Sequence, residues 1–157
     1  MSSRTMTGWL LVLGPIGCMA CWIIWGGVIG FPDSGDHGAM VAGISANAEA
    51  TKWLLGLAML FVFLLIGGLA GLRSSMAGGS GSNCATLGIL IIAMAATFSL
   101  GEIALNIAAA DAGAAGNAAV AMPIYLAGIG IGATSSAGIM LGIAILGYGV
   151  YTQKNFH

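Results

Sequence analysis

The chain has 157 residues, of which 59% are hydrophobic and 6% are charged, and its formal net charge is -1 at pH 7. Soluble globular domains carry a charge on about a quarter of their residues, so this composition argues against a soluble fold and predicts an integral membrane protein. With 4 Lys and Arg residues in total, nucleic acid is not expected as a partner, because affinity for phosphate chains comes largely from basic side chains.

Four apolar stretches are each long enough to cross a membrane. A helix needs about 20 apolar residues to cross about 30 Å of hydrocarbon. We therefore predict an all-α integral membrane four-helix bundle that forms a single transmembrane domain over residues 1–157, with the lipid bilayer as its surroundings. The predicted helices lie near residues 9–31, 53–72, 85–108 and 120–151.

The first predicted helix is followed by a polar turn and a short second helical segment. Gly, Asp and Pro residues are concentrated over 32–38, which is typical of a turn. Apolar residues then recur at helical spacing over 39–51. We predict a short extra-membrane helix there, which either lies at the membrane surface or extends the second span. Asp36 is its expected N-cap.

Asp33, Asp36 and His37 lie together in this turn, and all three are side chains that bind metal ions. A metal site shared with another chain is one interpretation. Turn formation and helix capping explain both aspartates without a metal and are the better explanation.

Cys18 and Cys21 have a C-x-x-C spacing inside the first predicted span. In a soluble loop this spacing would indicate redox chemistry or metal binding. A zinc site needs four ligands, and Cys84 is the only other cysteine among the 3 in the chain. We therefore interpret the pair as small apolar packing residues.

Glu102 is the only acidic residue inside a stretch that would otherwise be embedded in hydrocarbon. An ionisable group there is costly unless it is paired or protonated, and it commonly marks a functional site. Ser99 and Asn106 are expected on the same helical face, so the three residues are a candidate proton or cation site. The position of Glu102 toward the outer end of its span leaves contact with headgroups and structural hydrogen bonding as the alternative.

Small residues at four-residue spacing let membrane helices approach closely. Contact within the bundle is the simpler explanation of these faces, and contact with another subunit is the alternative. The last predicted helix favours the alternative, because its glycines recur on more than one face. The predicted packing residues are Gly26 and Gly30, Gly67 and Gly71, and Gly128, Gly132, Ser136, Gly138 and Gly142.

The few charged residues predict how the chain is oriented. Arg4, Arg73 and Lys154 lie at one end of the predicted spans, whereas the acidic residues other than Glu102 fall in connections at the opposite end. Under the positive-inside rule, the two termini and the 73–84 loop are cytoplasmic. The expected location is the inner membrane of a prokaryote.

No motif identifies a catalytic residue or a cofactor, so function is left to three hypotheses. The first is a small non-catalytic accessory subunit that packs against larger integral membrane proteins in a complex, or that self-associates. The second is an oligomeric proton- or cation-conducting channel or carrier that uses Glu102. The third is a membrane redox or metal-dependent enzyme subunit. The shortage of polar side chains in the predicted spans favours the first.

Overall fold

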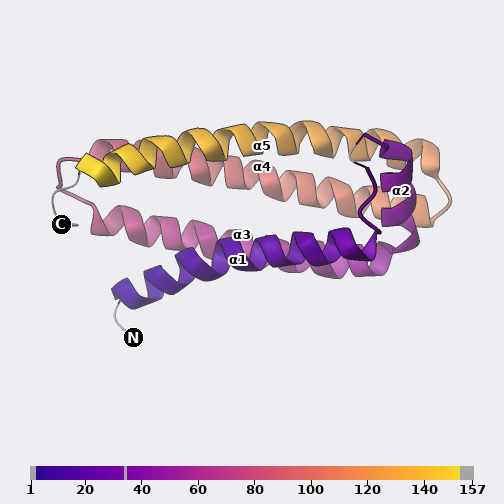
Figure 1. The fold of residues 1–157 in the computed structure, drawn as a ribbon, viewed down its shortest axis with the longest axis horizontal. Helices are drawn as coiled ribbons and strands as arrows, with labels where there is room; N and C mark the ends of the chain where they lie inside the picture. The colour runs from indigo at the N-terminus through magenta and orange to yellow at the C-terminus, as the bar shows by residue number, and fades with distance from the viewer. Residues whose placement is uncertain (1–2, 34, 153–157) are drawn as a thin grey trace.

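The computed structural model describes residues 3–33 and 35–152, and these residues form five helices. Four of the five helices are long and apolar enough to cross a membrane. The predicted all-α class with four membrane-length helices is therefore confirmed. The helices are α1 (Ser3–Val28), α2 (His37–Ala46), α3 (Ala48–Ser75), α4 (Ser82–Ala114) and α5 (Ala118–Thr152) (Figure 1).

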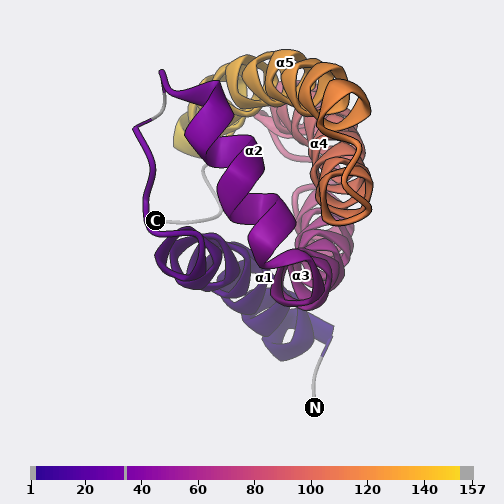
Figure 2. The same cartoon turned by 90° about the vertical axis from the view of Figure 1, so that its right-hand side faces the viewer.

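The long helices form two closely packed pairs, α1 with α3 and α4 with α5, and contacts between α3 and α4 join the pairs. Viewed from the α2 end, α1, α3, α4 and α5 follow one another around an incomplete ring (Figure 2). The ring is open between its first and last members, because α1 and α5 do not pack along each other. The start of α1 and the end of α5 lie at the end of the bundle opposite α2 (Figure 1).

The segment predicted as one helix over 39–51 is divided between two elements. The chain bends at Asn47, whose side-chain Nδ2 donates to the Gly43 carbonyl at 3.0 Å. Asn47 is the C-cap of α2, and α3 begins at the next residue, Ala48. The second long helix therefore starts earlier than the sequence predicted. The predicted cap is confirmed, because the Ala39 N–H donates to Asp36 Oδ1 at 2.8 Å.

Small residues let the backbones of α4 and α5 touch. A Cβ added at Gly88 would lie 2.5 Å from the Leu146 nitrogen, and one at Gly142 would lie 2.9 Å from the Gly88 carbonyl oxygen. Side chains larger than glycine do not fit at such positions without separating the helices. The residues of α5 on this seam include Gly128, Gly132, Ser135, Gly138, Gly142 and Gly149.

The pairing of α1 with α3 also depends on glycine. A Cβ at Gly14 would lie 2.8 Å from the Leu65 nitrogen, and one at Gly68 would lie 2.9 Å from the Leu11 nitrogen. Of the residues predicted for packing on α3, Gly71 faces the Thr7 side chain and Gly67 faces Leu10.

Gly26 and Gly30 have a different environment from the other predicted packing residues. The atoms nearest to a Cβ at Gly26 belong to Phe31, which follows α1 in the same chain. Gly30 lies beyond the end of α1 with a φ of 87°, a backbone conformation that favours glycine. The structure therefore does not place these two glycines against another long helix.

Candidate functional site

A cavity of about 600 Å³ lies between the four long helices. Side chains of α1, α3, α4 and α5 all contribute to its wall. Pockets that bind small molecules in proteins commonly have volumes of roughly 300–1,000 Å³. The cavity therefore has the size of a small-molecule site.

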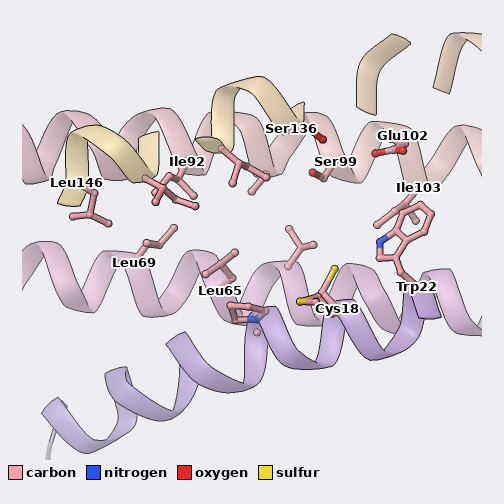
Figure 3. A pocket seen from close by; sticks show the side chains of 17 residues that line it. Cys18, Trp22, Leu65, Leu69, Ile92, Ser99, Glu102, Ile103, Ser136 and Leu146 are labelled. Atoms are coloured by element: carbon pink, nitrogen blue, oxygen red, sulfur yellow. The ribbon is translucent and has the colours of Figure 1, made fainter. Parts of the chain in front are cut away.

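The two ends of the cavity differ in polarity (Figure 3). At the end nearer α2, Ser99 and Glu102 of α4 and Ser136 of α5 lie on one wall, with Cys18 and Trp22 of α1 facing them. The opposite end is formed by the apolar side chains of Leu69, Ile92 and Leu146.

The half-buried side chain of Glu102 lies against α5 at Gly132. A Cβ atom added at Gly132 would overlap the Glu102 carboxyl group, so only glycine leaves room for the carboxyl in this position. Among the residues that the structure describes, none forms a hydrogen bond or an ion pair with this carboxyl group. The carboxylate is thus available to a bound molecule.

Ser99 and Asn106, the two residues predicted to share a site with Glu102, do lie on the face of α4 that meets α5. Neither hydrogen-bonds the carboxyl group. Asn106 Nδ2 donates to the backbone carbonyl of Glu102 at 3.1 Å, and Asn106 Oδ1 is buried without a partner. Asn106 is not part of the cavity wall.

The hydroxyl of Ser99 is fixed by a short chain of hydrogen bonds. Its Oγ lies 2.5 Å from Ser135 Oγ, and the Ser135 hydroxyl donates to the Ala95 carbonyl at 2.8 Å. A hydroxyl has one hydrogen to donate, so Ser99 must donate to Ser135. The remaining lone-pair capacity of Ser99 Oγ stays available at the cavity wall as a hydrogen-bond acceptor.

A salt-bridge cluster shows how deep Glu102 lies along the bundle. Lys52 Nζ, near the start of α3, lies 2.9 Å from Glu49 Oε1 and 2.7 Å from Asp111 Oδ1. At about 1.5 Å per residue, Arg73 is about 31 Å further along α3, close to the thickness of the hydrocarbon layer. By the same rise, Glu102 lies about 13 Å along α4 from Asp111.

If these two charged levels mark the membrane boundaries, Glu102 lies near the middle of the hydrocarbon layer. With boundaries at these levels, Glu102 would not meet the lipid headgroups, which was the alternative that the sequence left open. The difference arises because α4 extends to Ala114, beyond the end at residue 108 that the sequence predicted.

The two cysteines of the C-x-x-C pair have different environments. Cys21 is buried next to Trp25, which agrees with a packing role. Cys18 is half-buried and lines the cavity, which its apolar sequence context did not indicate. Both are free thiols, as is Cys84 near the start of α4.

The turn before α2 shows hydrogen bonding of the kind expected for a turn. Asp33 Oδ1 accepts a hydrogen bond from the Gly35 N–H at 3.0 Å, and Asp36 caps α2. Across residues 3–33 and 35–152, no three side chains of the metal-binding types come close enough to hold an ion. The His37 ring instead lies 6.0 Å from the ring of Tyr125.

Sequence reasoning did not identify Trp22 or Cys18 as cavity residues, and it named Ser136 only for packing. Ser135, the neighbour of Ser136, occupies the helix seam instead. The spacing of Gly128, Gly132 and Ser135 matches a seam with a 3.5-residue repeat. That repeat is the sequence signal that could have identified Ser135 as a residue of the α4–α5 seam.

Comparison with known proteins identified no relative of this chain. No protein-family model matches the chain, and no curated protein or solved structure matches it at a significant level. The chain is therefore characterised by its own architecture, an all-helical protein with four helices that could span a membrane and a cavity between them.

Proposed function

We propose that this protein binds a membrane-soluble small molecule in the cavity beside Glu102 and acts as a carrier or binding protein within the membrane. The observation that carries this proposal is the placement of a carboxyl group, without a partner among the described residues, on the wall of a 600 Å³ cavity. Ionisable groups at such a depth are costly and usually functional.

The open side of the helix ring supports this proposal. α1 and α5 belong to different helix pairs and do not pack along each other. In a membrane, that side of the bundle faces lipid, so a lipid-soluble molecule can reach the cavity between α1 and α5 without crossing water. A site for membrane-soluble molecules needs no aqueous entrance.

The polarity of the cavity favours a carrier or binding protein over an ion-conducting channel. An ion crossing the membrane needs polar groups or water along its whole path. Here the polar side chains are confined to the end near Glu102, and Leu69, Ile92 and Leu146 form the other end. An amphipathic molecule matches this division better than a bare ion does.

Charge distribution supports an orientation in which both ends of the chain are cytoplasmic. Arg4 and Arg73 lie at the end of the bundle opposite α2, whereas Asp33, Glu49 and Asp111 lie at the α2 end. Cytoplasmic connections carry an excess of Lys and Arg. In this orientation α2 is an extra-membrane helix on the outer side of a prokaryotic inner membrane. Lys154, which contributed to the same prediction, lies outside the described residues.

The outer face of α5 favours a second candidate function, that of an accessory subunit packed against a larger membrane protein or another copy. A Cβ at Gly130 or Gly147 would meet no atom within 4 Å, so both glycines face away from the bundle. A shift of two residues turns a helix by about 200°, which places this face opposite the α4 seam. Such small-residue faces let another helix approach closely. Its small exposed residues are Ala127, Gly130, Thr134, Ala137, Ala144 and Gly147, and the larger side chains of Leu141 and Tyr148 are exposed on the same face.

Native mass spectrometry of the full-length protein in a bulky steroid-based detergent tests the binding function. Dodecylamine and dodecanol serve as probes, and at least one is expected to form a one-to-one complex. Ser136 lines the cavity while its neighbour Ala137 is exposed on the outer face. Ser136→Phe should therefore abolish the complex, and Ala137→Phe should preserve it. The proposed function would be refuted if neither dodecylamine nor dodecanol formed a complex. Equal loss of the complex in Ser136→Phe and Ala137→Phe would refute it as well.

A further inference from the structure

The polar end of the cavity offers hydrogen-bond acceptors and a carboxyl group that can carry a negative charge. Glu102 supplies a carboxyl group with no partner in the described part of the chain, and Ser99 Oγ has lone pairs to spare because its hydrogen goes to Ser135. No Lys, Arg or His is among the described residues that line the cavity. A ligand that donates hydrogen bonds and carries a positive charge therefore complements this end when Glu102 is ionised.

We infer that the ligand of this cavity is an amphipathic organic cation, an amine or ammonium compound with an apolar body. This inference rests on the proposed function and specifies its ligand class. The cationic group lies beside Glu102, and the apolar body extends toward Leu69, Ile92 and Leu146.

Charge complementarity selects a cation over a neutral or anionic molecule. A carboxylate in a medium of low dielectric constant is costly by itself, and a cation in contact offsets much of that cost. A neutral molecule of the same shape provides no such compensation. An anion would be repelled by Glu102, because the described cavity wall contains no basic side chain.

Trp22 adds a second feature that suits a cation. It extends from α1 on the wall that faces Glu102, at the polar end of the cavity (Figure 3). Of the aromatic side chains, the indole ring attracts cations most strongly, and desolvation increases the attraction. A cation at this end is thus placed between a carboxylate on α4 and an indole on α1.

The length of the cavity sets the size of the apolar body. Glu102 and Ile92, which lie at opposite ends of the cavity, are about 15 Å apart along α4 at the usual helical rise. The wall between them includes apolar side chains such as Val62, Leu65 and Ile139. A medium-length alkyl chain or a small aromatic framework fits this dimension.

The test compares dodecylamine, dodecanol and dodecanoate, which share an apolar chain and differ in the head group. Dissociation constants are obtained by native mass spectrometry for the unmodified full-length protein and for Glu102→Gln, which keeps the shape of the side chain and removes its charge. The unmodified protein is expected to bind the amine at least about tenfold more tightly than the alcohol, since hydrogen bonds to charged groups are the stronger ones. Dodecanoate is expected to bind more weakly than both.

The outcomes separate this inference from the proposed function. Loss of the amine preference in Glu102→Gln, with the alcohol still bound, supports the assignment of Glu102. Equal binding of amine and alcohol by the unmodified protein, or tighter binding of dodecanoate, overturns the cation inference and leaves the binding function standing. An amine preference that survives in Glu102→Gln removes Glu102 from the site. Failure of both dodecylamine and dodecanol to bind overturns the binding function itself, and the cation inference with it.

Discussion

The carboxyl group of Glu102 on α4 lies directly over the backbone of Gly132 on α5, in a space that a Cβ atom at Gly132 would occupy. This relationship joins two features that the sequence alone does not connect, a glycine of a packing face and an acid within an apolar helix. It shows that one glycine of the α4–α5 seam creates room for the Glu102 side chain, whereas others allow the backbones to touch.

We predict that Gly132→Ala weakens binding of dodecylamine by about tenfold, which corresponds to about 1.4 kcal/mol. The added methyl group displaces the carboxyl from its position at the cavity wall. The effect on stability should be smaller, because the overlapping atoms belong to the end of a flexible side chain. Native mass spectrometry measures the binding. Gly130→Ala, on the outer face of α5, is the matched control and should bind normally. Equal weakening in both variants would contradict this role for Gly132.

Gly88→Ala is expected to destabilise the bundle by about 1–3 kcal/mol, the usual cost of overpacking a close interface. The added Cβ would lie 2.5 Å from the Leu146 nitrogen and 2.7 Å from the Gly142 carbonyl oxygen, so α4 and α5 must separate. Unfolding in detergent with increasing sodium dodecyl sulfate, followed by circular dichroism, gives the free energy of unfolding. Gly147→Ala meets no atom within 4 Å and should unfold like the unmodified protein. A Gly88→Ala protein as stable as this control would exclude close α4–α5 contact at Gly88.

Thr51→Val is expected to lower the free energy of unfolding by about 1 kcal/mol. Trp25 Nε1 of α1 donates to Thr51 Oγ1 of α3 at 3.1 Å, and Thr51 is 0% exposed. Valine keeps the shape of the side chain but leaves the indole N–H without an acceptor. The same unfolding measurement applies. In the control Thr134→Val, the lost bond is an exposed one to the Gly130 carbonyl of the same helix, and little change is expected. A larger loss in the control than in Thr51→Val would argue against the α1–α3 hydrogen bond.

Cysteine labelling should report on the cavity directly. N-ethylmaleimide is expected to modify Cys18, which lines the cavity, several-fold faster than Cys21, which is 3% exposed. Bound dodecylamine should slow the reaction at Cys18 and leave the rate at Cys84, outside the cavity, unchanged. Mass spectrometry of the digested protein measures each site. Protection of Cys84 to the same degree as Cys18 would indicate a general effect of the amine on the micelle.

The number and position of the long helices could be predicted from the sequence. Each apolar stretch must satisfy its backbone hydrogen bonds without water, and a helix does so within a single segment. Boundaries were less accurate where polar residues continue a helix, as at the start of α3 and the end of α4. The break at Asn47 was missed, because neither glycine nor proline stands at that position.

The candidate site could be predicted only in part. Glu102 was singled out because an acid within an apolar stretch is visible in any sequence. Its proposed partners Ser99 and Asn106 share its face of α4, yet both use their donors elsewhere. Trp22 and Cys18 join the site from a helix more than seventy residues earlier in the chain, and no local pattern specifies that approach.

Composition and the lengths of the apolar stretches thus determined, without any coordinates, that this chain is helical and suited to a membrane. Helix formation and membrane compatibility depend only on the residues of each segment and on the lipid or water around it. Which helices pair, and where the ring stays open, was decided only in three dimensions. Small residues occur on several faces of these helices, and the choice among the faces depends on how two backbones fit together. The cavity beside Glu102 follows from that choice. α1 packs on α3 and α5 packs on α4, but α1 and α5 do not pack along each other.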